Sequence, residues 1–294
     1  MSWQFTLTGF LIGALVGLSG MGGGSLMTPI LVLVFGFEPT YAVGTDILHG
    51  AIFKSFGAVR HRRLGTVHAR LATLMFLGSA PMSLAGVAVA GAFKHRYGSS
   101  AETVEGYAVG AALVAGGIGF LVKSVVTKGI RPSDAPFLLD RRDKVIAVTM
   151  GVVFGFVVGL TSVGSGTFFG LVMVLVYPLT MPKIVGTDIF HAAALLWVAG
   201  LGHLVAGNVD LHATAWLLLG SIPGVLLSSH FTVRLPDGAL RITLGTVLTL
   251  SGLKMLDVPA GNWILIGGLI TLAAVLVGYG LRAWLGPRLR AESA

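Results

Sequence analysis

The sequence predicts an all-α polytopic membrane protein built from two inverted-topology repeats. Of its 294 residues, 54% are hydrophobic and 11% are charged, and that charged fraction is about half the average for a soluble domain. Long apolar stretches recur along the chain, and the second half repeats the first. Each repeat is expected to hold a broken re-entrant hairpin plus three spanning helices, with one extra span at the C-terminal end.

The apolar stretches give the expected elements in order. Most are close to the roughly 20 residues that a helix needs to span a bilayer core. They cover residues 5–37, 43–59, 69–93, 105–126, 145–180, 185–206, 213–231, 239–256 and 263–285. The first lacks the basic n-region and small-residue cleavage site of a signal peptide, so we expect it to remain in the mature protein.

The duplication keeps one register, because adding 142 to a position in the first half finds its partner in the second. Positions 142 residues apart are here called repeat-equivalent. "VGTDILH" at 43–49 is equivalent to "VGTDIFH" at 185–191, and "GSAP" at 78–81 to "GSIP" at 220–223. Duplicated halves are a recurring plan of secondary transporters. The predicted divisions are 1–126 (first repeat), 127–144 (cytoplasmic linker), 145–257 (second repeat) and 258–294 (extra transmembrane helix and basic tail).

Basic residues give the expected orientation. Residues 60–68, "RHRRLGTVH", are strongly basic, whereas the equivalent loop 202–212 has no Lys or Arg. Positively charged loops stay in the cytoplasm, so the two halves are expected to be inverted, with the N-terminus outside and the C-terminus inside. The linker 127–144 is also basic. The net charge of +8 is therefore attributed to cytoplasmic loops, and no nucleic-acid partner is expected.

Residues 145–180 must then enter and leave on the same side, as two short half-helices or as two full crossings. Thirty-six residues are short for two spans plus a turn, so a re-entrant hairpin is favoured, turning at "GLTSVGSGTFFG". The repeat predicts a matching hairpin over 5–37, broken at "GLSGMGGGS".

Glycine-rich breaks in paired hydrophobic segments are typical of substrate sites in transporters. The half-helix after each break begins with unpaired backbone N–H groups and a positive dipole end, which suit an anion. The alternative is that these glycines only allow close helix packing. The predicted substrate-binding residues are Gly22, Gly23, Gly24, Ser25, Thr28, Thr45, Gly164, Ser165, Gly166, Thr167 and Thr187.

Asp46 and His49 share one helix face, as do Asp188 and His191. Ionisable groups in the hydrocarbon layer are costly and are treated as functional. Three interpretations are open: a proton relay, in which His titrates near neutrality; a structural Asp–His hydrogen bond or helix cap; and a divalent-metal site of two Asp and two His.

Lys54 follows Asp46 by two turns, and its repeat-equivalent is Leu196. It is assigned with the Asp–His pairs to proton coupling. It can pair with a carboxylate, snorkel toward the basic loop at Arg60, or face a bound anion. Snorkelling is the favoured position.

Two other functional classes remain as alternatives. A divalent-cation transporter would use the four Asp and His residues. An intramembrane serine protease would use "GLSG" at 17–20 with His49 as the base, but the repeat puts Thr161 opposite Ser19. The chain is not expected to be an enzyme. It contains no Cys, which excludes thiolate metal sites, and no resident cofactor is expected.

The chain resembles the sulfite exporter TauE/SafE family of permeases. The resemblance rests on "GLIGALVGLSGMGGGSLMTPILVLVFG", on the "AVGTD" opening of the next helix, and on the second copies "GFVVGLTSVGSGTFFGLVMVLV" and "IVGTD". It covers nearly the whole chain. It implies transport of small sulfur-containing or organic anions, such as sulfite or sulfonates, across the cytoplasmic membrane of a prokaryote, with coupling to protons.

The chain departs from the family pattern at Asp46 and Asp188, where many members carry a small polar residue, and at Ser165, which interrupts the second glycine cluster. An added carboxylate repels an anion unless it is protonated or paired. The expected partners are the anion, protons and the lipid bilayer, and the oligomeric state is open, homo-oligomers included.

Overall fold

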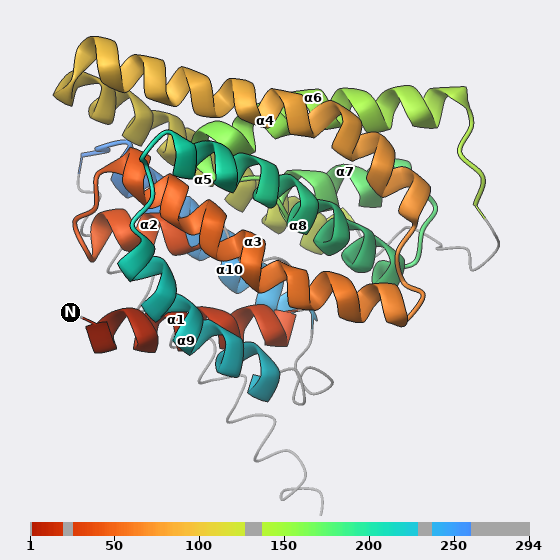
Figure 1. Ribbon diagram of the computed structural model, residues 1–294. Coiled ribbons are helices and arrows are strands. Elements are labelled where there is room, and N and C mark those ends of the chain that lie inside the picture. The colour runs from red at the N-terminus through yellow and green to blue at the C-terminus, as the bar shows by residue number, and fades with distance from the viewer. Residues whose placement is uncertain (1, 20–25, 127–136, 229–236, 260–294) are drawn as a thin grey trace, which may run out of the picture.

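The computed structural model of the protein describes residues 2–19, 26–126, 137–228 and 237–259 (Figure 1). These residues form helices and connecting turns, with no strand in the described ranges. The helices are α1 (Ser2–Ser19), α2 (Met27–Leu33), α3 (Pro39–Arg63), α4 (Ala69–Tyr97), α5 (Ser99–Val126), α6 (Arg141–Thr161), α7 (Phe168–Val176), α8 (Met181–Val205), α9 (Leu211–Ser228) and α10 (Asp237–Met255).

Several helices have the length and composition of membrane spans. Within the described residues, α4, α6, α8 and the Ser100–Val122 part of α5 are long and apolar enough to cross a bilayer. Shorter apolar helices cover Trp3–Val16, Leu211–Leu227 and Ile242–Met255. The chain is therefore a polytopic α-helical membrane protein. The extra span expected at 263–285 lies outside the described residues.

The two helical hairpins differ from the prediction in the lengths of their arms. α6 has 21 residues and α7 has nine, so residues 145–180 form one long helix and one short one instead of two half-helices. At 1.5 Å per residue α6 is about 31 Å long, enough to cross the bilayer core. In the first half, α1 has 18 residues and α2 has seven. The second break itself falls where it was predicted, because α6 ends at Thr161 and α7 begins at Phe168, both within "GLTSVGSGTFFG".

α6 also begins earlier than the sequence suggested. Its N-cap is Asp140, whose side chain accepts from the N–H of Asp143, while the Asp143 side chain accepts from the N–H of Asp140. This reciprocal capping box fixes the helix start. The range predicted as a linker, 127–144, thus includes the first turn of α6.

The helices pack in pairs that join the two halves of the chain. α1 lies against α9, α4 against α6, α3 against α8, and α5 against α10 (Figure 1). α1 and α6 are repeat-equivalent, and so are α9 and α4. Each half therefore supplies one helix to every pair.

Glycines bring the backbones of these pairs into contact. A Cβ added to Gly9 would lie 2.2 Å from the carbonyl oxygen of Leu217, and one added to Gly13 would lie 2.3 Å from that of Ser221. Residue numbers rise together along this interface, so α1 and α9 run parallel.

The repeat-equivalent interface is built in the same way. A Cβ on Gly151 would lie 2.3 Å from the oxygen of Met75, and one on Gly155 would lie 2.5 Å from that of Ser79. α4 and α6 therefore also run parallel. Small residues that allow such close approach are typical of membrane helix interfaces.

We predict that Gly220→Ala destabilises the protein. The new methyl group would lie 1.9 Å from the carbonyl oxygen of Thr6, so α1 and α9 must separate. Such overpacking costs about 1 to 3 kcal/mol. Thermal unfolding in detergent should show a lowered midpoint for Gly220→Ala. Gly91→Ala is the matched control, because nothing lies within 4 Å of its added Cβ. Equal midpoints for the two variants would contradict the close contact.

Candidate functional site

α3 and α8 form the centre of the site. A Cβ on Gly50 would contact Leu196, and one on Gly57 would contact Ile189. Residue numbers rise on one helix as they fall on the other, so the helices are antiparallel. Each carries one copy of the Asp–His motif, and all four side chains are at least 95% buried.

Asp46 joins the two broken segments. Its Oδ2 atom accepts a hydrogen bond from the hydroxyl of Thr28 at 2.6 Å and another from the hydroxyl of Ser162 at 2.8 Å. Thr28 lies in the first turn of α2, and Ser162 caps the C-terminus of α6. One carboxylate oxygen thus links the segment that follows the first break to the start of the second break. Two hydroxyl donors are the pairing that a buried carboxylate requires.

The second break, residues 162–167 between α6 and α7, contains backbone conformations that glycine adopts readily. Ser162 has φ 62°, Gly164 has φ 135° and Gly166 has φ 93°. A Cβ on Gly164 would also lie 2.9 Å from Val158. The chain therefore leaves α6 and enters α7 through conformations that most residues avoid.

The N-terminus of α7 offers fewer free donors than the sequence predicted. The N–H groups of Thr167 and Phe168 donate to the carbonyl oxygen of Gly164, at 3.2 and 3.1 Å. Within the described part of the chain, the N–H groups of Ser165 and Gly166 make no backbone hydrogen bond. The N–H of Gly164 makes none there either, so the predicted cradle is reduced to these three amides of the break.

Lys54 is buried against the second break. Its side chain is 3% exposed, and its Nζ atom donates to Ser165 Oγ at 2.7 Å. The favoured prediction of snorkelling toward Arg60 was wrong, because the stem extends into the helix bundle. The charge of Lys54 acts on Asp46, Asp188, His49 and His191.

The two histidines make equivalent contacts with the opposite half. His49 Nε2 lies 2.9 Å from Ser221 Oγ, and His191 Nε2 lies 2.9 Å from Ser79 Oγ. Both serines are fully buried, on α9 and α4. Because Asp46 bonds hydroxyls and His49 bonds Ser221, the Asp–His hydrogen bond of the structural interpretation is not made in the first motif.

Thr45 and Thr187 serve neighbouring loops. Thr45 Oγ1 accepts from the N–H of Asp210 at 3.0 Å, and Thr187 Oγ1 accepts from the N–H of His68 at 2.9 Å. These contacts hold the starts of α9 and α4. The two hydroxyls, which were predicted to bind substrate, accept hydrogen bonds from these loops.

Of the remaining predicted residues, the structure describes Thr167 but not the first glycine cluster. Thr167 Oγ1 is buried, has no hydrogen-bond partner among the described residues, and faces Gly116 of α5. Gly22, Gly23, Gly24 and Ser25 lie outside the described residues. So does the side chain of Ser19, the nucleophile in the protease alternative.

The metal alternative finds no support in the geometry. Among the residues that the structure describes, no three His, Asp or Glu side chains are close enough together to hold an ion. The four members of the Asp–His motifs all belong to the described part. They therefore do not form the predicted four-ligand site.

Comparison with known proteins identifies the family. The family model described as "Sulfite exporter TauE/SafE" matches residues 5–255. The chain belongs to the sulfite exporter TauE/SafE family. The family and its membrane-transporter relatives make this protein a membrane transporter.

Curated relatives match this TauE/SafE protein over most of its chain and nearly all of their own length. It is 37% identical to the probable membrane transporter protein YjnA of Bacillus subtilis (strain 168), over 87% of this chain and 100% of that protein. It is 23% identical to the probable membrane transporter protein YdhB of the same organism, over 84% of this chain and 97% of that protein. No solved structure matches the chain.

Sequence reasoning missed three residues of the TauE/SafE site. Ser162 holds Asp46, and Ser79 and Ser221 hold the two histidines. A signal for the last two was present, because "GSAP" and "GSIP" keep their serines in the register of the repeat. Ser162 had no such signal, since its repeat-equivalent is Gly20.

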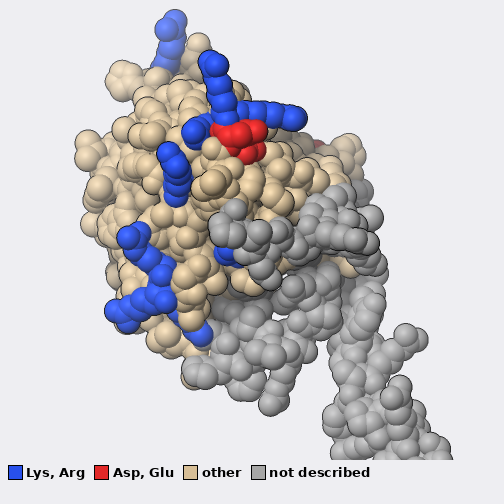
Figure 2. All heavy atoms as spheres, turned by 90° about the vertical axis from the view of Figure 1, so that its right-hand side faces the viewer, with Lys and Arg blue, Asp and Glu red and all other residues tan. Residues whose placement is uncertain are grey.

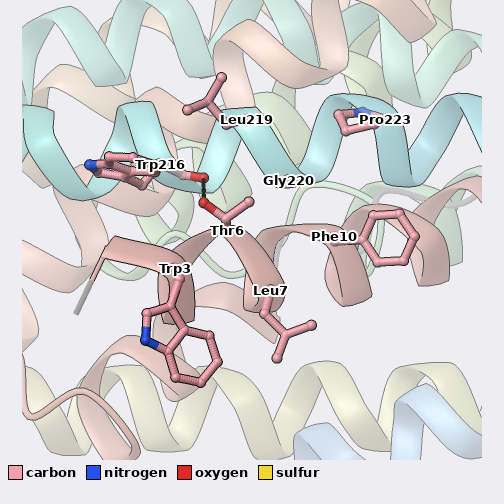
Figure 3. Close-up of a pocket in the computed structure, with 8 residues that line it drawn as sticks. All are labelled: Trp3, Thr6, Leu7, Phe10, Trp216, Leu219, Gly220 and Pro223. Atoms are coloured by element: carbon pink, nitrogen blue, oxygen red, sulfur yellow. Dashed lines mark hydrogen bonds between the residues drawn. The ribbon is translucent and has the colours of Figure 1, made fainter.

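A groove between α1 and α9 is lined almost entirely by apolar side chains. Figure 3 shows Trp3, Leu7 and Phe10 on one side and Trp216 and Leu219 on the other, with Thr6 donating to the carbonyl oxygen of Trp216 at 3.2 Å. Trp3 is 67% exposed. In a membrane transporter such a surface suits lipid acyl chains and not a small anion.

We predict that Ser79→Ala and Ser221→Ala destabilise the protein by similar amounts. Each removes the partner of a buried imidazole nitrogen, which costs about 1 to 3 kcal/mol. Thermal unfolding in detergent measures the loss, and Ser100→Ala is the control because Ser100 is exposed. A normal midpoint for both buried-serine variants would show that the imidazoles find other partners.

Proposed function

We propose that this TauE/SafE protein is a secondary transporter, acting as an exporter, of small sulfur-containing or organic anions such as sulfite or sulfonates, coupled to protons. The observation that carries the proposal is the second break. There a helix N-terminus, a buried Lys and a buried Asp meet between elements from both halves. An N-terminus with unpaired amides is an anion site by its charge and donors.

The proposal includes two inverted repeats. α1 runs parallel to α9, whereas α6, the equivalent of α1, runs parallel to α4, the equivalent of α9. The equivalent helices α3 and α8 are antiparallel. These directions support inversion, and a pseudo-twofold plan of this kind allows alternating access about a central site.

The orientation rests on the distribution of basic residues. Several Lys and Arg side chains gather on the face seen in Figure 2. Along the chain, basic residues cluster at the end of α3 and at or near the starts of α4, α6 and α8. These residues are Arg60, Arg62, Arg63, Arg70, Arg141, Arg142, Lys144 and Lys183. By the positive-inside rule this face is cytoplasmic. In a prokaryotic cytoplasmic membrane the N-terminus would then lie outside and the C-terminus inside.

In the proposed mechanism the amides of Ser165 and Gly166 hold the anion from the second break. Gly22 to Ser25 would do the same from the first break, by the repeat. Thr28 acts indirectly, because its hydroxyl donates to Asp46. The Asp–His motifs on α3 and α8 accept and release the coupled protons, since all four side chains are buried and Asp46 bonds directly to the second break.

Sulfite flux into proteoliposomes of the purified protein tests the proposal. We expect flux that rises with an imposed pH gradient and is absent from protein-free vesicles. Flux unaffected by the gradient would remove proton coupling. Folded protein that moves neither sulfite nor sulfonates would overturn the proposed substrate class.

We predict that Asp46→Asn and Asp188→Asn lower pH-driven flux while leaving substrate exchange largely intact. An amide cannot carry the coupled proton, whereas exchange of one anion for another needs no net proton movement. Loss on the order of 10-fold is expected for the driven flux. The contrary outcome is equal loss of driven flux and exchange in folded variants, which would assign the aspartates to binding or to structure.

A further inference from the structure

Lys54 has hydrogen-bonding capacity that the described residues do not use. An ammonium carries three N–H donors, and the described acceptor is Ser165 Oγ alone. The ion pair found in the described part of the chain is Lys94 with Glu38, so no described carboxylate lies within 4.0 Å of Lys54. Lys54 is also the only Lys or Arg that is buried among the described residues. A buried ammonium that has spare donors and no carboxylate partner among the described residues is suited to binding an additional anion.

The spare donors of Lys54 lie beside other unused donors of the second break. Ser165, which holds Lys54, belongs to the segment that opens α7, and its own N–H makes no backbone hydrogen bond in the described residues. The hydroxyl of Thr167, two residues on, is buried without a described partner. The buried ammonium and the helix N-terminus are independent features, and both favour negative charge at the same place.

This cluster occupies positions at which the two halves differ. Lys54 and Ser165 have the repeat-equivalents Leu196 and Gly23. Thr28 and Ser162, the partners of Asp46, have Gly170 and Gly20. In contrast, the pairs His49–Ser221 and His191–Ser79 stand at identical positions in both halves. The twofold plan is therefore kept in the histidine contacts and broken in the charged contacts.

We propose that Lys54 recognises the charge of the transported anion, and that it does so at the second break alone. This inference rests on the proposed function and reassigns Lys54 from proton coupling to substrate recognition. The anion is held by the Lys54 ammonium together with the Ser165 and Gly166 amides, off the pseudo-twofold axis. Asp46 and Asp188 act on the charge of Lys54 from longer distances and do not form an ion pair with it.

If Lys54 recognises the charge of the substrate, the transporter should bind a charged molecule better than a neutral molecule of the same shape. Methanesulfonate carries a permanent negative charge, and dimethyl sulfone is a neutral molecule of nearly the same shape. If Lys54 reads charge, methanesulfonate competes with sulfite for the site and dimethyl sulfone does not. A lysine with a purely structural role would have no effect on this discrimination.

The experiment measures sulfite flux in proteoliposomes with each competitor, for the wild type, Lys54→Arg, Lys54→Gln and Lys54→Leu. We expect Lys54→Gln to raise the KM for sulfite about 10- to 100-fold, as for a lost charge-assisted hydrogen bond, and to abolish the preference for methanesulfonate. Lys54→Arg should keep that preference. Lys54→Leu copies the residue of the other half and should behave as Lys54→Gln. Lys183→Gln, on the basic face, is the matched control.

An unchanged KM and an unchanged competitor preference in folded Lys54→Gln would overturn the inference while leaving the proposed function in place. Absence of sulfite and sulfonate flux in the wild type would instead refute the proposed function. Because Gln still donates a hydrogen bond to Ser165, it tests the charge even if Lys54→Leu fails to fold. Transfer of the lysine in Lys54→Leu/Leu196→Lys separates a one-sided site from a symmetric one. Full recovery of KM would overturn the one-sided site.

Discussion

The arrangement of the site depends on one carboxylate oxygen. Asp46 Oδ2 accepts from a hydroxyl of α2 and from a hydroxyl at the end of α6, so it links one broken segment of each half. Eight residues on, Lys54 holds Ser165 from the same helix. α3 of the first half therefore makes two hydrogen bonds to the second break, one between Asp46 and Ser162 and one between Lys54 and Ser165. The unusual backbone from Ser162 to Gly166 is held by these contacts, and its free amides are directed by them.

Much of the fold was predictable because membrane spans and an internal repeat leave direct marks in a sequence. The apolar stretches located most helices, and the register of 142 residues related α3 to α8 and α4 to α9. The glycines of "GLTSVGSGTFFG" marked the turn between α6 and α7. The full length of α6 was missed, because the polar capping box of Asp140 and Asp143 that starts it lies outside the apolar run. The partners of α1 and α6 were also hidden, since the glycines that set them pack against residues far along the chain.

The candidate site was predicted in its residue types more than in its contacts. Asp46, His49, Asp188 and His191 are buried as expected, but the contacts of Asp46 and His49 are with hydroxyls and not with each other. Lys54 was misplaced because the rule for long basic side chains considers only the nearest membrane face. A buried acceptor on another helix, Ser165, outweighed that rule. Thr45 and Thr187 show the opposite case, where a polar residue next to the motif is used to hold a loop.

The pairing of helices across the halves also delays the formation of helix interfaces during synthesis of the protein. α1 contacts α9 across 210 residues of sequence, as between Thr6 and Trp216. At a synthesis rate of about 5 to 20 residues per second, α1 waits roughly 10 to 40 s before its partner exists. During that interval the glycine-bearing face of α1 meets only lipid or the insertion machinery. Each of the four helix pairs needs one helix from each half. The first half therefore inserts as an incomplete bundle, and its interfaces form only when the second half supplies the partner helices.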